Sequence, residues 1–260
     1  MVAAKEMTYL DHIAELRRRL ITVVVTFVLA MVATFPFAGD IIDYLTAPVK
    51  DGLVVLRPAE AFYAHLQVSL AVAVVVNIPV LLYQLLAFIF PGLTPSEKRW
   101  VWLSIPPVIL LFVGGVLFAW FTVVPIIYRF FMGFTSEALQ PFISVGNYIS
   151  FVSGIVLPFG IVFELPVVIA LLTGMGLVTP SFLLRYRKYA VLIIFVMAAF
   201  LTPPDVVSQG FLALPLIGLF EASIGVSKVI HRRRQRALAR LEAELAAEEA
   251  AVEGASGTGR

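Results

Sequence analysis

The chain has 260 residues, of which 60% are hydrophobic and 14% are charged. Soluble domains have about half apolar and about a quarter charged residues, so this balance indicates an integral membrane protein. The sequence contains no cysteine, which excludes disulfides, iron–sulfur clusters, thiolate zinc sites and cysteine nucleophiles. The formal net charge of +2 is close to neutral, so the distribution of charges along the chain is more informative than their sum.

Six apolar stretches are candidates for helices that cross about 30 Å of hydrocarbon. The expected spans are residues 20–36, 62–90, 100–128, 148–173, 189–201 and 206–227. The fifth has 13 residues, or about 20 Å of helix, so the last two stretches are also compatible with one re-entrant hairpin. Prolines within the spans are expected to bend the helices. These features predict an all-α membrane protein with a curved, concave bundle whose last two helices are short.

Residues 1–19 form the first predicted element, an amphipathic cytoplasmic segment. Ile13 and neighbouring leucines recur at helical spacing and give one apolar stripe, which suits a membrane surface. Glu15 precedes Arg18 and Arg19 by three and four residues, the spacing of an ordinary helical ion pair.

A helix-start pattern precedes the third span. Thr94, Pro95 and Glu97 have the spacing of an N-cap, a proline at the first helical position and the glutamate of a capping box. The alternative is that Glu97 is an exposed cytoplasmic carboxylate that binds a basic ligand. The two roles are compatible if the side chain moves between them.

Glu164 interrupts the fourth span about 14 Å from its cytoplasmic end, close to the middle of the membrane. A carboxylate at that depth is costly and usually faces a cavity or a partner, which favours a functional role. The alternative is a protonated side chain that forms a hydrogen bond to another helix and stabilises the bundle.

The turn after the fifth stretch contains Asp205, which predicts either the start of the last helix or a more specific role. Residues 20–230 are expected to form one membrane domain, followed by a charged cytoplasmic tail at 231–260. The tail changes from basic to acidic, and its small, polar end at 250–260 is expected to be disordered.

The basic residues lie mainly on one side of this six-span arrangement. The N-terminal segment, the second and fourth loops and the C-terminal segment hold 16 of the 19, whereas the other side holds Lys50, Arg57 and Arg129. The positive-inside rule therefore predicts that both termini are cytoplasmic. A hairpin that returns to the cytoplasm would give the same orientation. The two outside loops, 37–61 and 131–147, are long enough to form a cap.

The sequence offers little basis for catalysis. His12, His65 and His231 lie on different segments, and no nucleophile elbow or Walker-type glycine loop occurs. We therefore expect no enzyme activity, no catalytic residue, no metal site and no cofactor. A competing hypothesis is a proton-coupled small-molecule transporter that uses Glu164. Its substrate site would depend on a few polar groups of the second span, namely Gln67, Asn77 and Gln84.

A series of short motifs runs through residues 12–228. In chain order they are residues 12–20 (HIAELRRRL), Ala47-Pro48, Pro79, Tyr83-Gln84, Phe88, Pro91-Gly92-Leu93, Glu97-Lys98-Arg99, residues 163–166 (FELP), Arg187-Lys188-Tyr189, Thr202-Pro203-Pro204-Asp205 and Gln209. In this order and spacing they resemble the TatC family, the polytopic core subunit of the twin-arginine protein translocase. Ile13 stands where leucine is usual and Leu86 where tryptophan is common, a difference that should alter packing only.

The resemblance implies a receptor subunit in the bacterial cytoplasmic (inner) membrane. It would bind twin-arginine signal peptides and, with TatA- and TatB-type single-span partners and the proton-motive force, move folded proteins across the membrane. Carried over by position, Glu97 and Glu15 are the expected partners of the twin arginines. Paired guanidinium groups bind carboxylates in charge-assisted, often bidentate geometry. Arg17, Phe88 and Arg99 complete the expected signal-peptide site.

The resemblance also implies roles at the other positions. Glu164 is expected to lie on the concave membrane face and to contact the partner subunits along the fourth to sixth helices. Pro48, Asp205 and Gln209 belong to the expected periplasmic motif. Further copies of the chain and membrane lipid are additional expected partners, and nucleic acid is not expected.

Overall fold

The computed structural model describes residues 9–49, 53–89, 95–136, 142–201 and 205–257. Its elements are α1 (Tyr9–Thr34), the 3-10 helix η1 (Phe35–Phe37), α2 (Ala38–Thr46), α3 (Glu60–Ile89), α4 (Pro95–Phe118), the π-helix η3 (Ala119–Val123), α5 (Val124–Met132), α6 (Val145–Val162), α7 (Leu165–Met175), α8 (Pro180–Leu201) and α9 (Val206–Gly257). An isolated bridge pairs Val54 with Ser144. The expected all-helical architecture is confirmed.

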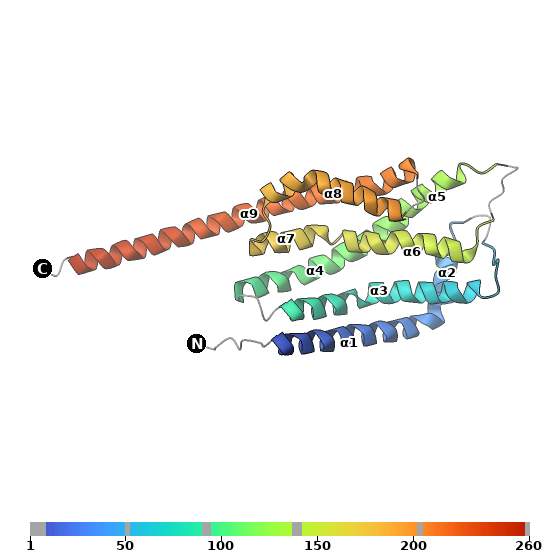
Figure 1. Cartoon of the computed structure of the whole chain (residues 1–260), viewed down its shortest axis with the longest axis horizontal. Helices are drawn as coiled ribbons and strands as arrows, with labels where there is room; N and C mark the ends of the chain where they lie inside the picture. Colours follow the sequence, from blue (N-terminus) through green and yellow to red (C-terminus); the bar gives the residue numbers. More distant parts are fainter. Residues whose placement is uncertain (1–8, 50–52, 90–94, 137–141, 202–204, 258–260) are drawn as a thin grey trace.

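The long helices lie side by side, with both termini at one end of the bundle and the longer loops at the other (Figure 1). α1 packs against α3, α6 packs against both α3 and α4, and α9 packs against α7 and α8. The fully buried core includes Ile127 of α5, Ile155 and Phe159 of α6, and Leu212 of α9. Val68 of α3 and Phe112 of α4 are buried as well, so the interior runs across the bundle.

Five helical stretches of the described residues are long and apolar enough to cross a membrane. They are His12–Thr46, Glu60–Leu85, Trp102–Met132, Val145–Met175 and Val206–Ala247. These stretches correspond to five of the six expected spans. The remaining one, 189–201, is the second half of α8, whose first half carries basic residues. One of them, Arg187, pairs with Glu221 of α9 over 2.5 Å between Nε and Oε1. The structure therefore supports about five to six long apolar helices.

The fourth expected span is two helices, α6 and α7, with a break at Phe163 and Glu164. Pro166 has no N–H to donate to the preceding turn. The Glu164 N–H instead bonds to the Ile161 carbonyl over 3.1 Å, a tighter turn than in an α-helix. The helix can restart at Leu165 because the break supplies the backbone geometry that Pro166 requires.

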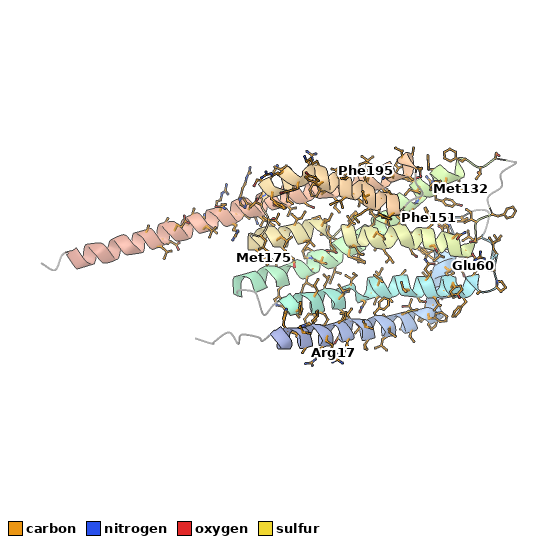
Figure 2. The ribbon with its side chains drawn as sticks, viewed as in Figure 1. Arg17, Glu60, Met132, Phe151, Met175 and Phe195 are labelled. Atoms are coloured by element: carbon orange, nitrogen blue, oxygen red, sulfur yellow. The ribbon has the colours of Figure 1, made fainter. Side chains whose placement is uncertain are left out.

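The end of the bundle that holds the longer loops is called the loop end. There, the two loops expected to form a cap are connected to each other by hydrogen bonds. The Val54 N–H donates to the Ile143 carbonyl and the Val145 N–H donates to the Val54 carbonyl, each over 3.1 Å. The Glu60 carboxylate accepts hydrogen bonds from the backbone N–H groups of Leu56, at 2.8 Å, and Gly146, at 2.9 Å. Figure 2 shows Glu60 at this end of the bundle.

Two boundaries differ from those expected. α1 begins at Tyr9 and continues into the first apolar stretch, so the described part of the N-terminal segment is not a separate element. α9 continues to Gly257 and extends beyond the bundle, where the sequence predicted a partly disordered tail (Figure 1). The tail is rich in alanine, glutamate, leucine and arginine, all strong helix formers, which explains a helix without a packed apolar face.

Candidate functional site

The first part of the site is the contact between α1 and α3 near the end that holds both termini. The His12 and Phe88 rings stack with centroids 4.3 Å apart and an interplanar angle of 19°. Farther along the pair, the Asn77 side-chain amide donates to the Val23 carbonyl over 3.3 Å. The aromatic stack and the amide therefore tie the two helices together on both sides of a polar cluster.

That cluster consists of Glu15, Arg19 and Gln84. Arg19 Nε donates to Glu15 Oε1 over 2.9 Å, and a second nitrogen of the guanidinium contacts the same oxygen. A third donates to the Gln84 side-chain oxygen over 3.2 Å. The ion pair expected from the spacing of Glu15 and Arg19 is confirmed, and Gln84 extends it to α3. The other carboxylate oxygen, Glu15 Oε2, is buried and has no hydrogen-bond partner among the described residues.

A recess of about 550 Å³ opens beside this cluster. Besides the cluster itself, its lining includes Arg18 on α1 and Tyr83 on α3. Two guanidinium groups and one carboxylate face the recess, so its own charge is positive. A cationic ligand could bind only by sharing Glu15 with Arg19 or by replacing Arg19 on it. The position of the Glu15 carboxylate therefore decides which cations the recess can accept.

The remaining residues of the expected signal-peptide site are distributed differently. Phe88 takes part in the stack with His12. Arg17 lies on the exposed outer face of α1, away from α3 (Figure 2). Glu97 and Arg99 belong to the first turns of α4, but their side chains lie outside the described residues, as does the expected cap residue Thr94.

Glu164 lies at the α6–α7 break, on the side that faces α4. Both of its carboxylate oxygens are buried and have no hydrogen-bond partner among the described residues. Close helix contact surrounds it, because a β-carbon added to Gly160 would stand 2.8 Å from the Phe112 ring. The structure thus keeps Glu164 between helices and separate from the recess at Glu15.

The three residues of the expected periplasmic motif fall into two places at the loop end. Asp205 caps α9, because its carboxylate accepts the Ser208 N–H over 2.7 Å, which confirms the expected helix start. The Gln209 side chain donates to the Phe195 carbonyl over 2.7 Å and so joins α9 to α8. Pro48 instead lines a separate recess that also contains Arg129. Sequence reasoning counted Arg129 only as a loop charge. Its position among aromatic residues was the signal that could have identified Arg129 as a candidate site residue.

The polar groups of the second span do not form a substrate site. Asn77 and Gln84 are used to hold α1, and Gln67 accepts a hydrogen bond from Ser150 over 3.1 Å. The fold and the recess together define a multi-pass helical membrane protein with a polar recess at one end of its bundle.

Comparison with known proteins identifies the family. The family model described as Sec-independent protein translocase protein (TatC) matches residues 11–215. The TatC of Carboxydothermus hydrogenoformans is 39% identical over 230 residues, which cover 87% of this chain and 95% of that protein. The TatC of Helicobacter pylori strain J99 is 38% identical over 223 residues, covering 85% and 88% respectively. The crystal structure of a twin arginine translocase receptor, TatC, matches with a TM-score of 0.77 at 39% identity, covering 84% of this chain and 99% of that one.

The chain belongs to the TatC family, whose members are the receptor subunit of the twin-arginine protein translocase. The resemblance in the motifs is thereby confirmed, and the chain is a translocase component, not an enzyme. The alternative of a small-molecule transporter is set aside.

Proposed function

We propose that this TatC-family subunit binds the twin arginines of signal peptides with Glu15 and Glu97. The observation that carries the proposal is the buried Glu15 Oε2, which has no partner among the described residues and lies beside an open recess. A guanidinium group is the ligand that such an oxygen accepts best, because its fork of donors matches a carboxylate. The first turn of α4 adds Glu97 at the same end of the bundle.

The other residues have supporting roles in this proposal. Phe88 stacks on His12 and so holds the α1–α3 contact beside the recess. Arg17 on α1 and Arg99 in the first turns of α4 add positive charge at the same end of the bundle, which repels basic peptides that lack a group able to use the carboxylates.

Binding of synthetic signal peptides to the protein in lipid nanodiscs tests this proposal. An Arg-Arg peptide is compared with a Lys-Lys peptide, for the native chain and for Glu15→Gln and Glu97→Gln. We expect selective Arg-Arg binding and a rise in Kd of roughly thirtyfold in each variant, since losing one partner of a buried charged pair costs about 2 kcal/mol or more. Glu244→Gln, which changes an exposed glutamate of α9, is the matched control and should leave Kd unchanged. Equal binding of both peptides would overturn the proposal.

The proposed orientation places both termini in the cytoplasm of a bacterium, with residues 20–230 in the inner membrane, and 1–19 and 231–260 on its cytoplasmic side. Sixteen of the 19 basic residues on one side support it, as does the common end of the two termini. Six spans, the last two of them α8 and the first part of α9, give a concave bundle closed by the loop-end cap. Pro48, Asp205 and Gln209 would then be periplasmic.

TatA- and TatB-type single-span subunits are the proposed partners along the fourth to sixth helices, with Glu164 near the contact and the proton-motive force as energy source. Self-association of the chain belongs to the same proposal. The apolar face of α8 supports contact with such partners, because Leu192, Ile193 and Phe200 are 60%, 57% and 86% exposed.

Cross-linking tests these partners directly, because the chain has no native cysteine. Leu192→Cys on α8 should form disulfides with single cysteines in the spans of TatA- and TatB-type subunits. Val28→Cys, on the exposed apolar face of α1, is the control. Cross-linking through Val28→Cys alone would place the partners elsewhere.

A further inference from the structure

A second recess lies at the loop end, away from the Glu15 site. Its volume is about 780 Å³, and its lining includes Pro48 after α2, Trp120 in η3, Arg129 on α5 and Tyr148 on α6. Three of the apolar stretches that could cross a membrane end or begin here, at Thr46, Met132 and Val145. The recess therefore lies at the depth where hydrocarbon gives way to lipid headgroups, whichever side of the membrane this end faces.

Arg129 supplies the positive charge of this recess. Its side chain is exposed, and no carboxylate of the described chain lies within ion-pair distance of it. Asp40 and Asp43 belong to nearby α2, yet neither forms an ion pair with it. An arginine at headgroup depth that has no carboxylate partner among the described residues attracts an anion.

Aromatic residues surround this arginine. Tyr44 and Trp120 have ring centroids 6.1 Å apart, and Tyr128 and Tyr148 meet edge to face at 6.0 Å. Tryptophan and tyrosine concentrate at the membrane interface because one part of each ring system is apolar and the other binds polar groups. The walls of the recess thus suit the glycerol region of a lipid as well as its headgroup.

A second, smaller groove adjoins the recess. It has a volume of about 280 Å³ and shares Tyr44, Trp120 and Phe121 with the recess. Its other lining residues are almost all aliphatic side chains of α3, α4 and α6, such as Val72, Leu117 and Val156. A recess that attracts anions therefore lies next to an apolar groove at membrane depth.

We propose that the recess and groove bind an anionic phospholipid of the leaflet at this end, with its phosphate on Arg129 and an acyl chain along the groove. The charge of Arg129 complements an anionic headgroup, and the adjoining apolar groove accounts for the attached chain. A free anion would not need the groove, and an apolar helix would not need Arg129.

Native mass spectrometry of the full-length protein tests this assignment. The protein is incubated with phosphatidylglycerol or phosphatidylcholine of identical acyl chains, and the retained lipid is counted. We expect phosphatidylglycerol to be retained preferentially. Arg129→Gln should lower its retention about fivefold, the effect of one basic residue near a lipid surface. Arg57→Gln removes the same charge from the same end, outside the recess, and should change nothing.

Two further arms separate the possible occupants. Leu117→Trp, which fills the groove, should reduce retention of long-chain phosphatidylglycerol but not of its short-chain form. Equal retention of the two lipids, or an equal effect of Arg57→Gln, would overturn the proposal. Displacement of the lipid by glycerol phosphate alone would assign the recess to small anions. Displacement by an apolar peptide helix, with no headgroup preference, would assign the groove to a protein segment.

Discussion

Gly115 of α4 lies directly against Phe163, the residue at the break between α6 and α7. A β-carbon added to Gly115 would stand 2.7 Å from the Phe163 β-carbon and 2.8 Å from the Phe159 carbonyl oxygen. Real β-carbons do not approach backbone and Cβ atoms that closely. The absence of a side chain at 115 is therefore what allows α4 to reach the break where Glu164 is held, as small residues do in other membrane helix contacts.

Gly115→Ala should separate α4 from α6 and lower the stability of the protein by about 1–3 kcal/mol, the usual cost of overpacking. The adjacent Gly114 gives a matched control, because a β-carbon there meets nothing within 4 Å. Thermal unfolding in detergent compares the two variants. A Tm for Gly115→Ala as high as that for Gly114→Ala would show that the contact relaxes without cost.

The Glu60 carboxylate should control the order of the loop end. Glu60→Gln keeps one acceptor oxygen and loses the other, so the bonds from Leu56 and Gly146 can no longer both be made well. We expect faster hydrogen exchange at residues 54–57 and 143–147 and a lower Tm. Asp43→Asn, an exposed carboxylate of the same end, should leave both unchanged. Unchanged exchange in Glu60→Gln would mean that the Val54–Ser144 bridge holds the loops without the carboxylate.

The hydroxyl groups of Thr173 on α7 and Ser227 on α9 lie 2.8 Å apart in a buried contact. Thr173 donates its proton to the Ile169 carbonyl, so Ser227 is the donor between the helices. A double-mutant cycle with Thr173→Val and Ser227→Ala should give a coupling free energy of about 0.6 kcal/mol, typical of hydrogen bonds between membrane helices. Strictly additive losses would show that packing alone joins α7 to α9.

Gly176 ends α7 with a φ of 83°, and the Arg234 guanidinium of α9 lies against it. Gly176→Ala should cost about 1–2 kcal/mol, because an L-residue is strained in this left-handed conformation, and its methyl group would also displace Arg234. Gly176→Asn should cost less, since asparagine tolerates this region better. Equal Tm values for both variants and the native protein would mean that the turn has adopted another conformation.

Much of the fold follows from local sequence. The apolar stretches that became α3 and α6 with α7 are long and nearly uncharged, so their helical state depends on solvent and composition rather than on neighbours. The Glu15–Arg19 pair and the Asp205 cap also depend on spacing within one helix. By contrast, the continuous helix through the tail was missed, because small polar residues at its end suggested disorder where helix propensity is high.

The sequence by itself determined that this is a helical membrane protein, and its motifs identified the family. Only the tertiary structure decided which side chains meet. Gln84 binds Arg19 from 65 residues away, and Glu60 binds Gly146 from 86 away. Pro48 and Arg129 share one recess. Hydrophobicity and capping act within a few residues, whereas these contacts depend on how closely helices approach and where they break, which Gly115 and Pro166 decide in the folded bundle.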